Sequence, residues 1–128
     1  MNKILLLLAG GAIGTLSRYF ISTLTLKFYE GIFPLGTLVV NLIGSFVIGL
    51  LWGFFEQNGD STNLRAFVFV GILGGFTTLS SFSLETMNLF RDNEIKMGIL
   101  NILANNILAL LLVFLGFILA KGIITIIK

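Results

Sequence analysis

Long apolar stretches separated by short polar ones run along the whole chain. Four of them are long enough to cross a bilayer, because about 20 helical residues, rising about 1.5 Å each, span a hydrocarbon core of roughly 30 Å. We expect transmembrane helices near residues 4–26, 34–55, 65–90 and 97–126. The separators between them are too short to hold a folded unit. The pattern therefore predicts an all-α membrane protein with a single four-helix domain over residues 1–128.

Two of the helix starts carry recognisable boundary signals. Pro34 fits the first turn of the second helix, where a missing N–H costs little. Asp60, Ser61 or Thr62 is expected to cap the third helix, since these side chains accept hydrogen bonds from free N–H groups of a first turn.

The composition supports lipid as the solvent of this chain. Of its 128 residues 56% are hydrophobic and only 11% are charged, more apolar surface than so small a soluble domain could bury. The net charge of +2 is small and scattered, so we expect no nucleic-acid partner. The chain has no Cys and no His, which excludes disulfides, zinc sites and thiol chemistry and removes the usual general base.

The distribution of positive charge gives almost no preferred orientation in the membrane. With four spans, Lys3, Arg65, Lys121 and Lys128 fall on one side, and Lys27, Arg91 and Lys96 fall on the other. Positive residues near helix ends normally fix the direction of insertion. The near balance predicts insertion in both directions and assembly as an antiparallel homodimer, while a single, weakly biased orientation stays open.

A polar stripe is expected along the second helix. Thr37, Asn41, Ser45, Gly49 and Gly53 are spaced by four, which places them on one face. Polar side chains inside lipid normally face protein or water. The stripe favours a pore lining whose amide and hydroxyl groups donate to an anion; simple contact between helices is the alternative.

The third helix contains an unusual segment, Gly74 to Ser83, with the sequence GGFTTLSSFS. Paired glycines lower helix propensity, and hydroxyl side chains compete for backbone hydrogen bonds, so we expect the helix to break near its middle. If two copies met across a two-fold axis at this break, the released carbonyls could hold one small hard cation. A continuous helix with a hydroxyl-rich face is the competing interpretation.

Several other polar or aromatic residues inside the spans allow two interpretations. Phe76 and Phe82 are ordinary packing residues or rings that meet an anion edge-on. Arg18 and Glu85 would be costly in lipid unless paired or hydrated, so each belongs to a vestibule or an ion pair. Asn101, Asn105 and Asn106 in the fourth helix join helices or line a pore.

These motifs resemble the Fluc (CrcB) family of fluoride channels over essentially the whole chain. The agreement lies in GGAIGTLSRY at residues 10–19, GTLVVNLIGSFVIG at 36–49 and GGFTTLSSFS at 74–83, in that order. The resemblance implies an antiparallel, dual-topology homodimer with two fluoride pores in a prokaryotic plasma (inner) membrane. Fluoride would flow passively out of the cytoplasm, with lipid as surroundings and no enzymatic activity.

The resemblance also assigns roles to individual residues. It implies a structural Na⁺, not transported, held by the backbone carbonyls of Gly74 and Thr77. It also places Asn41, Ser80, Ser81 and Phe82 in the fluoride pore and Arg18 in the vestibule. To this expected pore the polar stripe of the second helix adds Thr37, and the polar residues of the fourth helix add Asn105. Leu79 departs from the family pattern, because a first pore phenylalanine commonly stands there, and one ring edge is lost from each pore.

Two other functions compete with a fluoride channel. A small proton-coupled exporter of cationic drugs also uses four short helices, but it needs a carboxylate in its first helix, where this chain has Arg18 and no Asp or Glu. A non-transporting assembly subunit would explain the glycines and leave the polar stripe without a task. An enzyme is the least favoured class, since Ser80, Ser81 and Ser83 have no His or Lys nearby in their helix.

Overall fold

The four expected spanning helices are confirmed in the computed structural model, which describes residues 2–128. Four helical segments are long and apolar enough to cross a membrane: Asn2–Phe28, Leu35–Phe55, Thr62–Arg91 and Ile95–Ile127. The first two are the single helices α1 (Asn2–Phe28) and α2 (Leu35–Phe55). The ends of all four segments differ from the expected ends by no more than three residues. The largest difference is at the start of the third segment, which begins at residue 62 and not at 65.

The third and fourth segments are each divided into several elements. The third comprises α3 (Thr62–Arg65), η1 (Ala66–Leu73), α4 (Gly74–Phe76) and α5 (Leu79–Arg91). The fourth comprises α6 (Ile95–Leu103), η2 (Ala104–Leu108) and α7 (Ala109–Ile127). Both η elements are π-helical, a detail that the hydropathy pattern does not predict.

The helix starts follow the local signals. The side chain of Ser61 accepts a hydrogen bond from the N–H of Leu64 at 3.2 Å and so caps α3, as expected for one of three candidate residues. Pro34 occupies the position before α2, which begins at Leu35.

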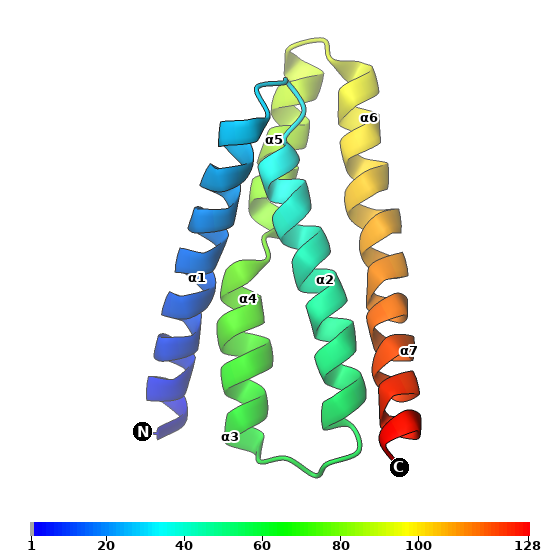
Figure 1. The fold of residues 1–128 in the computed structure, drawn as a ribbon. Coiled ribbons are helices and arrows are strands. Elements are labelled where there is room, and N and C mark those ends of the chain that lie inside the picture. Colours follow the sequence, from blue (N-terminus) through cyan, green and yellow to red (C-terminus); the bar gives the residue numbers. More distant parts are fainter. Residues whose placement is uncertain (1) are drawn as a thin grey trace.

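The segments form an up-and-down bundle in which the third segment lies between α1 and α2 (Figure 1). Both termini lie at the same end of the bundle, together with the connection between α2 and α3. α1 packs on η1 and α4, α2 packs on α7, and α5 packs on α6. The lower and upper halves of the third segment therefore have different neighbours.

Glycine backbones make the two main helix contacts close. A Cβ on Gly10 would lie 2.7 Å from the carbonyl oxygen of Phe67, and one on Gly71 would lie 3.0 Å from Cα of Gly10. Between α2 and α7, a Cβ on Gly49 would collide with the Val113 carbonyl oxygen, and one on Gly116 with that of Phe46. These glycines therefore serve packing within one chain.

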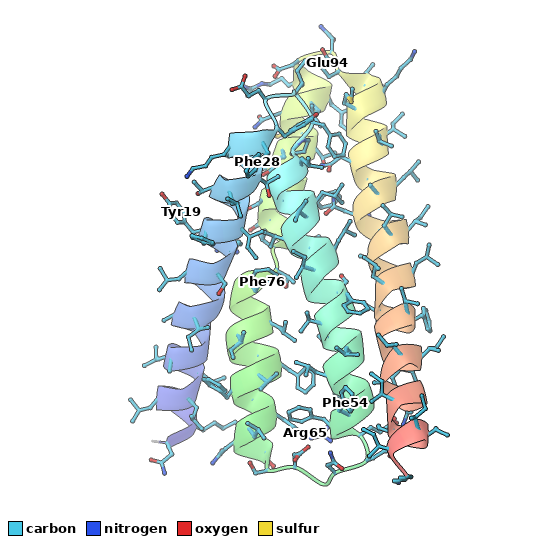
Figure 2. The ribbon with its side chains drawn as sticks, in the orientation of Figure 1. Tyr19, Phe28, Phe54, Arg65, Phe76 and Glu94 are labelled. Atoms are coloured by element: carbon cyan, nitrogen blue, oxygen red, sulfur yellow. The ribbon has the colours of Figure 1, made fainter. Side chains whose placement is uncertain are left out.

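Polar contacts join the segments at the end where the termini lie. Arg65, labelled in Figure 2, donates through Nη2 to the carbonyl oxygen of Phe55 at 2.7 Å and lies over the ring of Trp52. It thereby satisfies a free carbonyl at the C-terminus of α2. Lys121 of α7 pairs with Glu56 at 2.7 Å.

The α2–α7 contact gives the first prediction. Gly49→Ala places a methyl group against the Val113 backbone, so we expect a loss of about 1–3 kcal/mol in the free energy of unfolding. Unfolding in detergent micelles can be followed through the fluorescence of Trp52, the single tryptophan. Gly122→Ala in α7 is the matched control, because a Cβ there meets nothing within 4 Å. Equal stability of the two variants would contradict the close contact.

Candidate functional site

Two extended residues lie between α4 and α5, near the middle of the third segment. Thr77 has φ −82° and ψ 158°, and Thr78 has φ −150° and ψ 116°. Figure 1 shows a short link without helical turns between α4 and α5. The side chain of Thr78 accepts from the N–H of Ser81 at 3.1 Å, so it caps α5 inside the bundle.

Asn41, in the middle of α2, pairs with the extended backbone of Thr78. Its Oδ1 accepts from the N–H of Thr78 at 2.8 Å, and its Nδ2 donates to the carbonyl oxygen of Thr78 at 3.0 Å. One side-chain amide thus satisfies both polar groups of an extended peptide, as a neighbouring strand would. The second N–H of the same Nδ2 donates to Oδ1 of Asn105 at 3.0 Å.

A chain of hydrogen bonds continues from Asn105 back to α5. Nδ2 of Asn105 donates to Oδ1 of Asn101 at 2.9 Å and to its carbonyl oxygen at 3.0 Å. Nδ2 of Asn101 donates to the hydroxyl of Thr86 at 2.9 Å, and that hydroxyl donates to the carbonyl oxygen of Phe82 at 2.8 Å. This chain of hydrogen bonds begins at Thr78 and ends at the carbonyl of Phe82, about one helical turn later in the sequence.

Two neighbouring asparagines of the π-helical turn η2 bond to carbonyls of their own segment. Asn105 donates to the carbonyl of Asn101, and Asn106 donates to that of Ile102 at 2.7 Å, each four residues back. These are the carbonyls that N–H groups of an α-helix would use, so the two amides are satisfied within their own segment.

The carbonyls of Gly74 and Thr77 lose their α-helical donors at the same place. The N–H four residues after Gly74 is that of Thr78, which donates to Asn41. The N–H four residues after Thr77 is that of Ser81, which donates to the Thr78 hydroxyl. Gly74 is exposed, and a Cβ on it would meet only the Phe69 carbonyl oxygen, at 3.7 Å.

A cavity of about 290 Å³ lies beside the extended residues, between α2, the third segment and η2. The structure places four of the sequence-predicted site residues around it, namely Asn41, Thr77, Phe82 and Asn105. Leu79 also lines it and is 75% exposed. Ser45 and Gly44, from the polar face of α2, lie in the same wall.

The remaining predicted site residues do not line this cavity. Ser80 is exposed, with its hydroxyl 3.4 Å from that of Thr78, and Ser81 is half-buried. Thr37 donates to Oε1 of Glu85 at 2.6 Å, while Oε2 of Glu85 is buried with no partner among residues 2–128. Arg18 in α1 is half-buried and forms no ion pair within the described part of the chain.

The sequence of the chain matches a known family. The profile of the family described as CrcB-like protein, Camphor Resistance (CrcB), matches residues 5–117. The chain belongs to this family. A protein of Parabacteroides distasonis called fluoride-specific ion channel FluC is 54% identical over 128 residues, which cover 100% of both chains.

Relatives from other lineages of the CrcB-like family carry the same name. The Dehalococcoides mccartyi protein is 48% identical over 118 residues, covering 91% of this chain and 90% of its own. The Pyrococcus abyssi protein is 46% identical over 122 residues, covering 94% and 98%. These relatives are named as ion channels, so the family is not one of enzymes, in agreement with the sequence analysis.

Sequence reasoning missed two members of the hydrogen-bond chain in this CrcB-like protein. Thr78 and Thr86 are buried, at 9% and 7% exposure, although both are hydroxyl residues that are common on helix surfaces. Their position inside an otherwise apolar span was the signal that the sequence offered, since a hydroxyl in lipid needs a partner.

The pairing of Asn41 with Thr78 gives the second prediction. Asn41→Leu leaves the N–H and the carbonyl of Thr78 without their partner, at a cost of about 1–3 kcal/mol for each buried group. We expect a clear fall in the denaturant midpoint, measured by Trp52 fluorescence in micelles. Thr125→Val is the control, because among the described residues that exposed hydroxyl bonds only to a carbonyl of its own helix. If both variants unfold at the parent's midpoint, the pairing contributes nothing to stability.

Proposed function

We propose that this chain forms a fluoride-selective ion channel through which fluoride leaves the cytoplasm by passive flow. The observation that carries the proposal is the cavity at the extended residues, lined by Asn41, Phe82 and Asn105 inside a span that is otherwise apolar. The name shared by the relatives, fluoride-specific ion channel, supports fluoride as the ion. The expected location is the plasma (inner) membrane of a prokaryote.

The start of α5 supplies the electrostatic attraction for an anion in this proposal. A helix that begins inside the membrane directs its first N–H groups and its positive dipole end toward the neighbouring cavity. Thr78 and Leu79, at this start, line the cavity. The hydroxyls of Ser80 and Ser81 and the edge of the Phe82 ring would replace water around fluoride as it passes.

Asn41 has a more structural part in this mechanism than a free pore amide. Both N–H groups on its Nδ2 are donated to protein oxygens. Fluoride passing the cavity would compete with Thr78 and Asn105 for these donors, or would be stabilised by the dipole of the oriented amide.

A second copy of the chain is the partner that this arrangement needs. Ser80, Ser83 and Asn106 are exposed near the middle of the span, where lipid cannot satisfy polar groups. A second copy would cover them. The nearly even positive charge at the two ends supports an antiparallel, dual-topology homodimer with lipid around it.

The carbonyls of Gly74 and Thr77 fit a structural Na⁺ between the two copies. Their helical donors are engaged elsewhere, and carbonyl oxygens are suitable ligands for a hard cation. Among residues 2–128 there is no cluster of three His, Cys, Asp or Glu side chains that would compete for it. The bound ion would offset repulsion between the facing carbonyls.

Efflux from liposomes tests the channel. We expect purified protein to release fluoride rapidly and chloride slowly, each followed with its own electrode. Phe82→Leu should lower fluoride flux by about threefold to tenfold, since an aromatic contact contributes about 0.5–1.5 kcal/mol. Leu79→Phe, which adds a ring to the same cavity wall, should equal or exceed the parent.

The outcomes of this experiment test the channel function and the role of Phe82 separately. Well-folded protein that releases no fluoride would overturn the channel. Release that is unchanged by Phe82→Leu would leave the channel in place and remove Phe82 from the fluoride pathway.

Gly74→Val tests the proposed contact between copies. Within one chain a Cβ at this position makes only an ordinary contact, with the Phe69 carbonyl oxygen at 3.7 Å, so stability of the single chain should be kept while the dimer is lost. Light scattering of the detergent-solubilised protein reports the molecular mass. Gly122→Val is the control, because a Cβ there meets nothing within 4 Å among residues 2–128. A dimer that persists in Gly74→Val would place the partner elsewhere.

A further inference from the structure

Asn101 is the most deeply buried polar residue of the hydrogen-bond chain and does not line the cavity. It is 1% exposed, and both ends of its side-chain amide are bonded. Thr86, its partner on α5, is also buried and away from the cavity wall. Burying an amide inside a membrane protein costs desolvation free energy, which a leucine at the same position would not. We therefore look for a role of Asn101 beyond holding two helices together.

The directions of the hydrogen bonds in this chain agree with one another from end to end. The Thr86 hydroxyl gives its only proton to the carbonyl of Phe82, so it can offer Asn101 nothing but a lone pair. Asn101 must therefore turn Nδ2 toward Thr86 and Oδ1 toward the next amide in the chain.

Backbone groups orient the next two amides. The Asn101 carbonyl can only accept, so it holds Nδ2 of Asn105, and the N–H and carbonyl of Thr78 fix both ends of the Asn41 amide. Asn101 is oriented by Thr86 on one side and by Nδ2 of Asn105 on the other. A flipped amide anywhere would set two donors or two acceptors against each other in a low-dielectric interior.

We propose that Asn101 and Thr86 are positioning residues for ion conduction, which hold the amides of Asn105 and Asn41 in place and thereby hold Thr78 and the start of α5 against the cavity. The inference rests on the proposed channel function. Without the Thr86 acceptor, Nδ2 of Asn101 loses its partner, so Asn101 holds Asn105 less firmly and the support of Asn41 and Thr78 weakens.

Two substitutions of Thr86 separate hydrogen bonding from packing. Thr86→Val keeps the shape and removes the hydroxyl, whereas Thr86→Ser keeps the hydroxyl and removes a methyl group. We expect Thr86→Val to lower fluoride efflux about tenfold and to weaken the exclusion of chloride, and Thr86→Ser to stay near the parent. A role in packing alone would give the reverse order.

A second readout does not depend on transport. The N–H of Thr78 should exchange with D₂O about tenfold faster in Thr86→Val than in the parent, as measured by NMR of ¹⁵N-labelled protein in micelles. Thr125→Val is the matched control, because Thr125 also donates to a carbonyl four residues back but has no second partner. Both its efflux and its Thr78 exchange should equal those of the parent.

Asn101→Leu repeats the test at the neighbouring position and is available if Thr86→Val fails to assemble. The proposal is overturned if Thr86→Val or Asn101→Leu, folded as in the parent, leaves Thr78 exchange and fluoride selectivity unchanged, or if Thr86→Ser is as impaired as Thr86→Val. An unmodified chain that releases no fluoride would refute the channel instead, and the exchange rates would still decide whether Asn101 and Thr86 position Thr78.

Discussion

The pairing of Asn41 with the backbone of Thr78 is the constraint on which the middle of this structure depends. Hydrocarbon offers no water to a backbone that leaves the helix, so each freed N–H and C=O must find a partner inside the protein. Asn41 supplies both for Thr78, at 2.8 and 3.0 Å. The two extended residues, the start of α5 and the cavity beside them all require that this pairing be in place, because an unpaired peptide there would favour a continuous helix.

Extended residues in the middle of a span give the chain two helix ends where a continuous helix has none. The end at Phe76 leaves carbonyls that attract cations, and the start at Leu79 leaves N–H groups that attract anions. Opposite charges are therefore favoured a few residues apart without any ionised side chain. This separation explains how a span with so few charges can interact with ions, and why glycines and hydroxyls gather at residues 74–83.

The sequence could predict the parts of this fold that follow from period and composition. Apolar stretches of sufficient length predict four helices, and the spacing of Thr37, Asn41 and Ser45 predicts a polar face on α2. The sequence could not predict which backbone groups Asn41 bonds to, since the choice of partner depends on how far α2 is displaced along the third segment.

The π-helical turn at residues 104–108 could not be predicted from the sequence either, because the hydropathy pattern does not distinguish such a turn from α-helix. Thr86 and Asn101 lie 15 residues apart, on opposite sides of a turn, and their contact depends on the register between α5 and α6. A shift of one residue in either helix would separate them. Register in this part of the bundle is thus maintained by polar bonds whose directions are mutually dependent, whereas between α1 and η1 and between α2 and α7 it is maintained by glycine contacts. The first kind of contact specifies orientation as well as distance, and orientation is what a small, strongly hydrated anion would need from the groups that replace its water.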